Sequence, residues 1–595
     1  MEYTDVTISR LFEIPAYQLQ HYPQVDALAY KEGRSWVKIS IEQVIEQINE
    51  ISYGLLALGV RKGDKVAIVS PNRPEWILMD YAIQQIGAIS VPLYPTITIA
   101  DYKFILKDSS ASLVFVEGVK LFERVHEAAQ GLETVRGIYS FDRIEEAPHW
   151  REVCQKETSA AREQLQSVKS SIDPQDLVTI IYTSGTTGNP KGVMLSHHNI
   201  LSNALAVGKI FPATGHQIRT LSFLPLCHIF ERTASFMAVY LGVSIYFAES
   251  IDTIGENLRE VKPHYFSAVP RLLEKTYEKI MDTGRSLTGI KKRLFDWSLD
   301  LAQQYQLPMK KSWWYRFQLH LANKLVFKKW RAALGGNVGF IVSGAAALHS
   351  GIARAFWAAQ IPVLEAYGLT ETSPGVCFTP LDYETARIGC VGYPLEGVSV
   401  KIANDGEILV KGPNVMKGYY QRQDLTDDVI NSEGWLHTGD IGSLSEHNLL
   451  KITDRKKEIF KTSGGKYVAP QLLENHFKES AFIDQMMVVG EGEKFPAALI
   501  VPSTERVKQW AKSQALSFNS IMELLEEPRV VQLFNDIVDQ KNQHFAQFEK
   551  VKKFQLIPDE WSVESGELTP TLKLKRRILL KKYQTQIQSF YRQTS

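Results

Sequence analysis

The sequence Leu177-Val-Thr-Ile-Ile-Tyr182 is followed directly by Thr183-Ser-Gly-Thr-Thr-Gly-Asn-Pro-Lys-Gly192. The first part is short, apolar and β-branched, which is typical of a buried strand. The second part is a loop rich in glycine and hydroxyl groups. Residues 193–195 can extend the backbone, and Ser196 can cap a helix that continues to Leu205. A strand, a glycine-rich loop and a helix in this order predict a loop that cradles phosphate groups.

The composition of the 183–192 loop supports this prediction. Its glycines allow a close backbone approach, its hydroxyls can donate hydrogen bonds, and its lysine supplies a mobile positive charge. These residues are Thr183, Ser184, Gly185, Thr186, Thr187, Gly188, Lys191 and Gly192. The loop is not a Walker A motif, because Asn189-Pro190 separates Gly188 from Lys191 and no Ser or Thr follows the lysine. Composition alone would also fit a flexible surface loop.

The length and charge of the chain exclude several classes of protein. With 595 residues, 44% of them hydrophobic, we expect two or more soluble globular domains. Lys and Arg number 67 against 66 Asp and Glu, so there is no electrostatic case for nucleic-acid binding. The four cysteines show neither metal-site nor disulfide spacing, which favours a reducing, cytoplasmic compartment.

No apolar run in the sequence is long enough to cross a bilayer, and the first residues do not resemble a signal peptide. We therefore expect no membrane-spanning segment, although contact with a membrane surface stays open.

Alternating strand and helix patterns organise the first two thirds of the chain. Strands are predicted at 65–70, 89–93 and 113–116, with helices at 41–58, 75–86 and 102–108. This βαβ order predicts an α/β fold in which helices wrap sheets. Residues 338–454 are rich in strands, whereas residues from 455 onward are richer in Lys and Glu, with helices near 470–480, 505–545 and 573–592. We predict a large domain at 1–454 with a β-rich end, and a small α+β domain at 455–595.

Residues 285–331 are unusually basic and aromatic. Eleven Lys and Arg residues face only Asp296 and Asp300. Interleaved with them are the aromatic residues Trp297, Trp313, Trp314, Tyr315, Phe317, Phe327 and Trp330. One interpretation is a helical stretch that lies in a membrane interface. The other is a set of helices whose aromatic rings pack on the large domain while the lysines face water.

Several further stretches, taken with the 183–192 loop, give the chain a family resemblance. They are Glu365-Ala-Tyr-Gly-Leu-Thr-Glu371, Gly434-Trp-Leu-His-Thr-Gly-Asp440, Ser343-Gly-Ala-Ala-Ala-Leu348, Leu224-Pro-Leu-Cys-His-Ile-Phe230, Asp454-Arg-Lys-Lys457, Ser463-Gly-Gly-Lys-Tyr-Val-Ala-Pro470 and Gly566-Glu-Leu-Thr-Pro-Thr-Leu-Lys573. In this order they resemble the motifs of the AMP-forming adenylating superfamily, which includes acyl-CoA synthetases, luciferases and peptide-synthetase adenylation domains. The resemblance covers nearly the whole chain.

The resemblance implies a set of ATP-binding residues. The 183–192 loop would hold the phosphates, Tyr367 and Gly368 would contact adenine, and Gly344 and Ala345 would line the adenine pocket. Thr370 would bind the α-phosphate and Glu371 would hold Mg²⁺, since a carboxylate suits a hard cation that bridges phosphates. Asp440 would accept hydrogen bonds from both ribose hydroxyls. Arg455 would contact ribose or phosphate.

The same resemblance implies the residues that act on the acid and on coenzyme A. Lys573 would bridge the attacking carboxylate and the α-phosphate; charge alone could not choose it over Lys575, Arg576 or Arg577. His228 would border the acyl site, and Lys457 would lie at a hinge. Gly464 and Gly465 would line the coenzyme A tunnel. The small domain would rotate to use opposite faces in the two half-reactions.

Three stretches are similar to long-chain acyl-CoA synthetases in particular: 224–232, 269–275 and 453–461. They imply a ligase that joins a fatty acid and coenzyme A, with ATP and Mg²⁺, and releases AMP and pyrophosphate. Alternatives are an acyl-AMP ligase that serves a carrier protein, a non-catalytic nucleotide or lipid binder, and an ADP-forming phosphotransferase. Chain-length preference, and the choice between monomer and homodimer, stay open.

Overall fold

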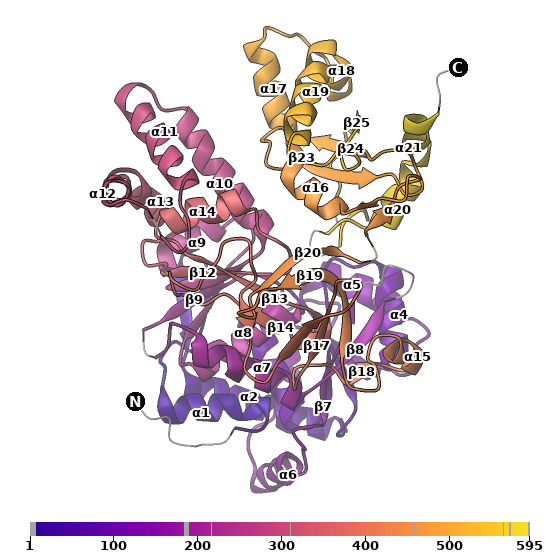
Figure 1. Ribbon diagram of the computed structural model, residues 1–595. Coiled ribbons are helices and arrows are strands. Elements are labelled where there is room, and N and C mark those ends of the chain that lie inside the picture. The colour runs from indigo at the N-terminus through magenta and orange to yellow at the C-terminus, as the bar shows by residue number, and fades with distance from the viewer. Residues whose placement is uncertain are drawn as a thin grey trace. The chain divides into compact units, whose positions relative to one another are not determined.

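A computed structural model describes residues 8–183, 190–215, 217–309, 311–456, 458–562, 565–569 and 573–592 (Figure 1). The chain divides into two compact units. Unit one comprises 1–401, 409–437 and 444–450, and unit two comprises 402–408, 438–443 and 451–595. The predicted α/β class with a large and a small part is confirmed, while the exact division at 454/455 stays a prediction.

The first sheet of unit one has the strand order β18-β8-β7-β4-β3-β5-β6. Its bounds are β3 (Lys65–Val69), β4 (Ile89–Leu93), β5 (Leu113–Val116), β6 (Gly137–Ser140), β7 (Leu177–Thr183), β8 (Lys191–Ser196) and β18 (Gly418–Tyr419). The four pairings among β3 to β7 are parallel. The accompanying helices are α2 (Ile41–Ala57), α3 (Pro74–Gln85), α4 (Ile99–Ser109), α5 (Gly118–Ala129), α6 (Ser159–Ser170) and α7 (His197–Ile210). Parallel strands joined by helices are the predicted βαβ arrangement.

The segment around the 183–192 loop has the expected strand, extended segment and helix, in that order, and adds a strand pairing that was not predicted. β7 and β8 form an antiparallel hairpin, and helix α7 begins after β8. Ser196 caps α7 as predicted, because its side chain accepts a hydrogen bond from the Asn199 amide. The loop therefore joins two paired strands, and its two ends lie side by side.

The second sheet of unit one has the order β15-β14-β13-β12-β11-β9-β10-β1-β2. Its bounds are β1 (Leu28–Glu32), β2 (Ser35–Ile39), β9 (Arg219–Ser222), β10 (Ser244–Phe247), β11 (Tyr265–Ala268), β12 (Phe340–Ser343), β13 (Val363–Gly368), β14 (Gly375–Phe378) and β15 (Tyr393–Pro394). Helices α1 (Ile14–His21), α8 (Ile229–Tyr240), α9 (Ile254–Val261) and α14 (Ser350–Ala358) and the 3-10 turns η1 (Leu11–Glu13), η2 (Trp150–Glu152) and η4 (Thr370–Thr372) also belong to unit one. One continuous hydrophobic core includes buried residues of both sheets.

The basic segment 285–331 lies within a group of consecutive helices of unit one, beside α14 (Figure 1). The group comprises α10 (Pro270–Arg285), α11 (Gly289–Gln303), α12 (Trp313–Ala322), the π-helical turn η3 (Asn323–Phe327) and α13 (Lys328–Ala333). Between residues 399 and 455, a four-stranded sheet has the order β16-β17-β19-β20. Its bounds are β16 (Ser399–Ile402), β17 (Glu407–Lys411), β19 (Leu436–Leu444) and β20 (Leu450–Arg455), and α15 is Gln423–Asp427.

Unit two contains the sheet β23-β24-β25 and the hairpin β21-β22. The bounds are β21 (Phe460–Lys461), β22 (Tyr467–Val468), β23 (Ile483–Val489), β24 (Ala497–Pro502), β25 (Lys553–Leu556), α16 (Pro470–Phe477), α17 (Thr504–Ser513), α18 (Ile521–Glu526), α19 (Pro528–Asn542), α20 (Arg576–Lys582) and α21 (Gln584–Tyr591). Alternate residues of β23 and β24 enter two separate cores, one with α16 to α19 and one with α20 and α21 (Figure 1). The single helix expected near 505–545 is in fact three, because turn residues interrupt it at 514–520 and Pro528 starts a new helix.

Candidate active site

The two ends of the 183–192 loop are held together by the β7–β8 hairpin. Thr183 pairs with Lys191 across the hairpin. The predicted phosphate-binding residues Ser184, Gly185, Thr186, Thr187 and Gly188 lie outside the described residues. Packing explains the glycine at position 192. A Cβ there would lie 2.7 Å from the Ile180 side chain and 3.2 Å from both the Tyr182 ring and the Tyr420 Cβ. The close packing of the hairpin is therefore enough to require a glycine here, without any contact with a phosphate.

A tyrosine that the sequence did not single out lies next to Lys191, a predicted phosphate ligand, and Glu371, the predicted Mg²⁺ ligand. The Tyr419 hydroxyl donates a hydrogen bond to Glu371 Oε1 at 2.9 Å. Lys191 Nζ lies 5.0 Å from the centre of the Tyr419 ring, within the range of a cation–π contact. Burial, together with the charge of Glu371, raises the pKa of Tyr419, which therefore stays a hydrogen-bond donor. Because β18 pairs with β8, an ammonium group and a carboxylate from distant segments meet around one ring.

The turn after β13 has a backbone that only particular residues allow. A Cβ at Gly368 would lie 1.7 Å from the Pro374 carbonyl oxygen. Ser373 has a left-handed φ of 64°. Asn414 Nδ2 donates to the carbonyls of Thr372 and Gly375, at 3.1 and 2.8 Å. These contacts fix the position of η4, which carries Thr370 and Glu371.

The ends of β12 and β13 bring the predicted adenine-binding residues to one edge of the second sheet. The two strands are parallel neighbours, so their carboxyl ends coincide. Gly344 and Ala345 follow β12, and Ala345 has a left-handed φ of 70°. Tyr367, near the end of β13, is 7% exposed, so most of its ring is packed inside unit one.

A buried carboxylate supports this edge. Glu365 accepts hydrogen bonds from the backbone of Gly389 and Leu348, and burial raises its pKa to about 7. It thereby ties the segment after β12 to β13. The sequence shows Glu365 within the motif but gives no sign of this role.

His228 caps helix α8. Its Nδ1 accepts a hydrogen bond from the Phe230 amide at 3.2 Å, so this nitrogen is not protonated in the bond. Four residues on, Arg232 is fully buried and forms an ion pair with Asp80 at 2.5 Å, and its Nη1 donates to Thr179. The motif that contains His228 therefore also anchors α8 to α3 and β7.

In unit two, the predicted ribose ligand and the arginine that was predicted to contact ribose or phosphate form an ion pair. Arg455 Nε lies 3.2 Å from Asp440 Oδ1, and the Asp440 carboxylate is almost fully buried. Lys456 binds Asp405 and Glu407 at 2.6 and 2.8 Å. The hinge residue predicted beside them, Lys457, lies outside the described residues.

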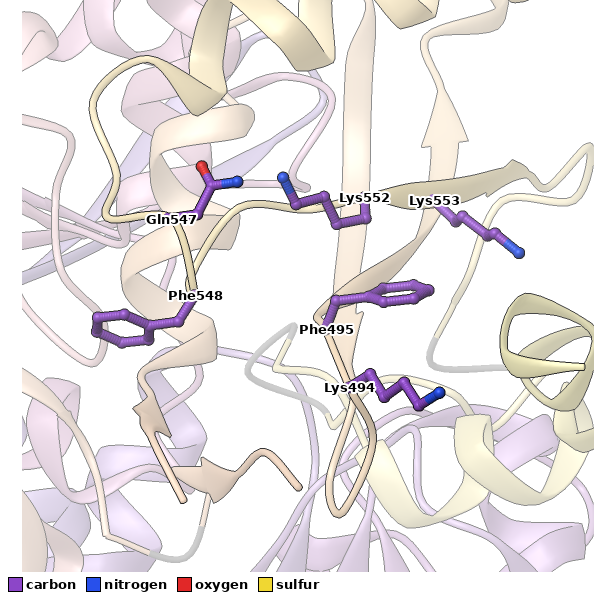
Figure 2. Close-up of a pocket in the computed structure, with 6 residues that line it drawn as sticks. All are labelled: Lys494, Phe495, Gln547, Phe548, Lys552 and Lys553. Atoms are coloured by element: carbon purple, nitrogen blue, oxygen red, sulfur yellow. The ribbon is translucent and has the colours of Figure 1, made fainter. Parts of the chain in front are cut away.

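Gly464 and Gly465 form the turn of the β21–β22 hairpin, and Gly465 has a left-handed φ of 78°. Thr462 closes this turn, because its amide donates to the Lys466 carbonyl at 2.9 Å. Lys466 Nζ lies 6.0 Å from the ring of Phe548. The turn thus lies beside a pocket of about 640 Å³ (Figure 2).

The pocket is lined by Lys494, Phe495, Gln547, Phe548, Lys552 and Lys553. Figure 2 shows that the lysines and rings come from the β23–β24 connection, from the segment before β25 and, for Lys553, from the start of β25 itself. Three ammonium groups and two phenyl rings suit an anionic ligand with an aromatic ring.

Lys573 lies on a hairpin-like segment of unit two. Leu568 forms a bridge with Leu574, and the Thr569 amide donates to the Lys573 carbonyl at 2.8 Å. The Lys573 amide in turn donates to Thr569 Oγ1 at 3.0 Å. Both the carbonyl and the amide of Lys573 are therefore hydrogen-bonded to Thr569, which fixes the backbone at this position.

Two anchors, which sequence reasoning missed, hold this segment. Glu567 binds Lys582 at 2.7 Å, and Arg576 Nε binds Glu458 Oε2 at 3.0 Å. Arg576 also forms an ion pair with the buried Glu474 and donates to the Val488 carbonyl at 3.1 Å. In the sequence, Arg576 stands in the basic run from Lys573 to Arg577. Nothing in that run indicates which of its side chains points into the fold.

Glu371 is the one predicted metal ligand. Among the described residues, no three His, Cys, Asp or Glu side chains gather in a way that could hold a metal ion. A single half-buried carboxylate fits Mg²⁺ nonetheless, because this ion keeps several waters and is bound mainly through substrate phosphates.

Comparison with known proteins identifies the class. The model of the AMP-binding enzyme family matches residues 16–420, and that of the AMP-binding enzyme C-terminal domain matches 457–595. The chain belongs to the AMP-binding enzyme family.

Relatives along the whole chain have more specific names. The long-chain-fatty-acid–CoA ligase FadD15 of Mycobacterium bovis is 33% identical over 580 residues, covering 93% of this chain and 92% of the relative. Long-chain-fatty-acid–CoA ligase 5 of Rattus norvegicus is also 33% identical, covering 94% and 85%.

Solved structures share the fold. The adenylation domain of a carboxylate reductase from Mycobacterium chelonae aligns with a TM-score of 0.77 at 22% identity, covering 99% of this chain and 92% of that domain. An anthranilate CoA ligase in complex with anthranoyl-AMP aligns with a TM-score of 0.70 at 18% identity, covering 96% and 97%.

Proposed function

We propose that this protein is a long-chain fatty acid:CoA ligase. A fatty acid carboxylate attacks the α-phosphorus of ATP, and pyrophosphate leaves. The thiol of coenzyme A then attacks the acyl carbonyl of the acyl-adenylate, and AMP leaves. The observation that carries the proposal is the meeting of Lys191 and Glu371 around Tyr419, in a chain similar throughout to long-chain ligases.

The nucleotide lies, in this proposal, at the carboxyl edge formed by β12, β13 and the β7–β8 hairpin. Gly344, Ala345, Tyr367 and Gly368 contact adenine, and Thr370 binds the α-phosphate. Lys191 and the residues Thr183, Ser184, Gly185, Thr186, Thr187 and Gly188 hold the other phosphates. Asp440 binds the ribose and Arg455 assists it.

Glu371, oriented by Tyr419, holds Mg²⁺. When bound, this ion neutralises phosphate charge as pyrophosphate departs. Lys573 supplies the second positive charge, which bridges the attacking carboxylate and the α-phosphate as negative charge builds there. His228 borders the acyl chain.

The small domain, 455–595, rotates about Lys457 between the two half-reactions. In the second one, Gly464 and Gly465 line the path of the thiol. The pocket of Figure 2 is suited to the nucleotide portion of coenzyme A, because its lysines match phosphate charge and its rings match an aromatic base.

We place the protein in the cytoplasm, in peripheral contact with a membrane through residues 285–331. This setting supplies ATP, coenzyme A and a fatty acid substrate that partitions into bilayers. No helix within the described ranges has the length and apolar composition that crossing a bilayer requires.

The test is the exchange of labelled pyrophosphate into ATP in the presence of a long-chain fatty acid. The wild type should catalyse exchange, and Lys573→Ala should lower its rate about 10²–10³-fold, as expected for one preorganised charge. Lys575→Ala is the matched control, because it removes a neighbouring lysine, and should stay within about threefold of the wild type. The proposal would be contradicted if the wild type catalysed no exchange, or if Lys573→Ala and Lys575→Ala exchanged at the same rate.

A further inference from the structure

Helix α12 and the turn η3 present a row of large apolar side chains outward. Trp313, Trp314 and Phe317 are 76%, 53% and 51% exposed, and Leu321 and Leu325 continue the row. The spacing of 313, 317, 321 and 325 places them along one side of a helix. The rings of Trp314 and Phe317 stack at 5.6 Å, so the row is a continuous apolar strip.

The opposite side of the same helix is firmly packed. Tyr315, Leu319, Ala322 and Phe327 are buried. The Tyr315 hydroxyl donates to the Leu301 carbonyl at 2.7 Å, and Asn323 Nδ2 donates to the Ala358 carbonyl at 2.9 Å. The interpretation that the aromatic residues of 285–331 pack on the large domain therefore holds for Tyr315, Phe327 and Trp330. It does not hold for Trp313, Trp314 and Phe317.

The charge around the strip is of one sign. The sequence contains no acidic residue between Asp300 and Glu365. The exposed charges of this segment are Arg316, Lys324, Lys328 and Lys329. Arg331 is engaged inside the fold with Asn323 and the Ala359 carbonyl.

Most acidic residues named on the adjacent helices pair with cations of their own helix. Asp296 on α11 pairs with Lys292, and on α10 Asp282 pairs with Arg285 and Glu274 with Arg271. Asp300 on α11 is exposed, and its single negative charge is outnumbered by the exposed cations of α12, η3 and α13.

We infer that the strip Trp313, Trp314, Phe317, Leu321 and Leu325, with Arg316, Lys324, Lys328 and Lys329 around it, binds the surface of an anionic bilayer. The choice of a membrane as the partner rests on the peripheral membrane contact proposed above. The inference does not depend on the ligase chemistry. Aromatic and leucine side chains enter the boundary between headgroups and acyl chains, while lysine stems reach up to anionic phosphates. The strip lies on a fixed helix, so no folding is needed on binding.

Charge complementarity favours a bilayer over a second copy of this chain. A twofold dimer would set this basic surface against itself, and the like charges would repel. An anionic bilayer instead attracts each of these side chains over about one Debye length.

The experiment is flotation of the full-length protein with large unilamellar vesicles. Vesicles of phosphatidylcholine alone are compared with vesicles containing 30% phosphatidylglycerol, at low and high salt. The wild type should bind the anionic vesicles and be released by salt. Lys324→Gln/Lys328→Gln/Lys329→Gln should weaken binding about 100-fold, since each lysine near such a surface contributes about fivefold.

A matched control carries Lys103→Gln/Lys107→Gln/Lys120→Gln, three exposed lysines on α4 and α5, and should bind like the wild type. Trp313→Gln/Trp314→Gln/Phe317→Gln should lose binding even at low salt. Equal binding of both lysine variants, or no binding by the wild type, overturns the inference. So does a dimer that dissociates only in the aromatic variant.

Pyrophosphate exchange in vesicle-free buffer separates the two proposals. If exchange is absent while the vesicle results hold, the ligase proposal fails and the membrane surface stands. If exchange is normal while flotation fails, the reverse is true.

Discussion

Replacing Arg576 with alanine should loosen unit two and, with it, the segment that carries Lys573. Arg576 is the partner of two carboxylates, and one of them, Glu474, is buried. Burial alone would lower the pKa of Arg576, but the charges of Glu474 and Glu458 outweigh it and raise that pKa. Without the arginine, Glu474 keeps the Val488 amide as a donor but loses its compensating charge. Breaking a buried ion pair on one side costs about 3–5 kcal/mol.

Amide hydrogen exchange of the full-length protein measures this cost locally. Peptides that cover α16 and β23 should exchange at least about 100-fold faster in Arg576→Ala, the equivalent of about 3 kcal/mol. Arg577→Ala, the exposed neighbour, is the control and should leave these peptides unchanged. If Arg576→Ala stays within threefold of the wild type, the network does not hold the segment and the reasoning is refuted.

Three further predictions concern single residues. Asp454 is buried, which raises its pKa to about 7, above the usual value near 4 in an unfolded chain. The folded state then binds the extra proton, so the stability that this group contributes is present below about pH 4 and is lost as the pH rises through 7. Asp454→Asn should therefore match the wild type at pH 4 and exceed its free energy of unfolding by about 2–4 kcal/mol at pH 8 in urea titrations; an equal gain at both pH values would contradict this. Tyr419→Phe removes the hydrogen bond to Glu371 and should raise KM for Mg-ATP about tenfold or more with an unchanged melting temperature, whereas an unchanged KM would show that the bond does not orient the carboxylate. Gly368→Ala forces a Cβ against the Pro374 carbonyl and should cost about 1–3 kcal/mol of stability in thermal melts, and a wild-type melting temperature would show that the turn yields freely.

Much of the fold could be predicted from the sequence because its local signals agree. The β-branched run at 177–182, the capping Ser196 and the βαβ order of residues 65–116 all appear as predicted. The hairpin of β7 and β8 could not be predicted, since the pairing of strands depends on contacts that a local pattern does not carry.

The candidate site was predictable where residues stand in ordered motifs, and hidden where distant segments supply support. Glu371 and Lys191 could be chosen from their motifs, but Tyr419 reaches them only because β18 pairs with β8. Glu365 and Arg576 look like ordinary charged residues in the sequence. Their partners come from segments 17 or more residues away, so only the folded chain shows what they hold.

The nucleotide products formed from Mg-ATP and palmitate, with and without coenzyme A, show whether the protein is an AMP-forming acyl-CoA ligase. Such a ligase gives AMP and pyrophosphate in equal amounts, with sustained turnover only when coenzyme A is present. AMP formation that is indifferent to coenzyme A would indicate an enzyme that serves a carrier protein, and ADP as the product would contradict an AMP-forming ligase altogether.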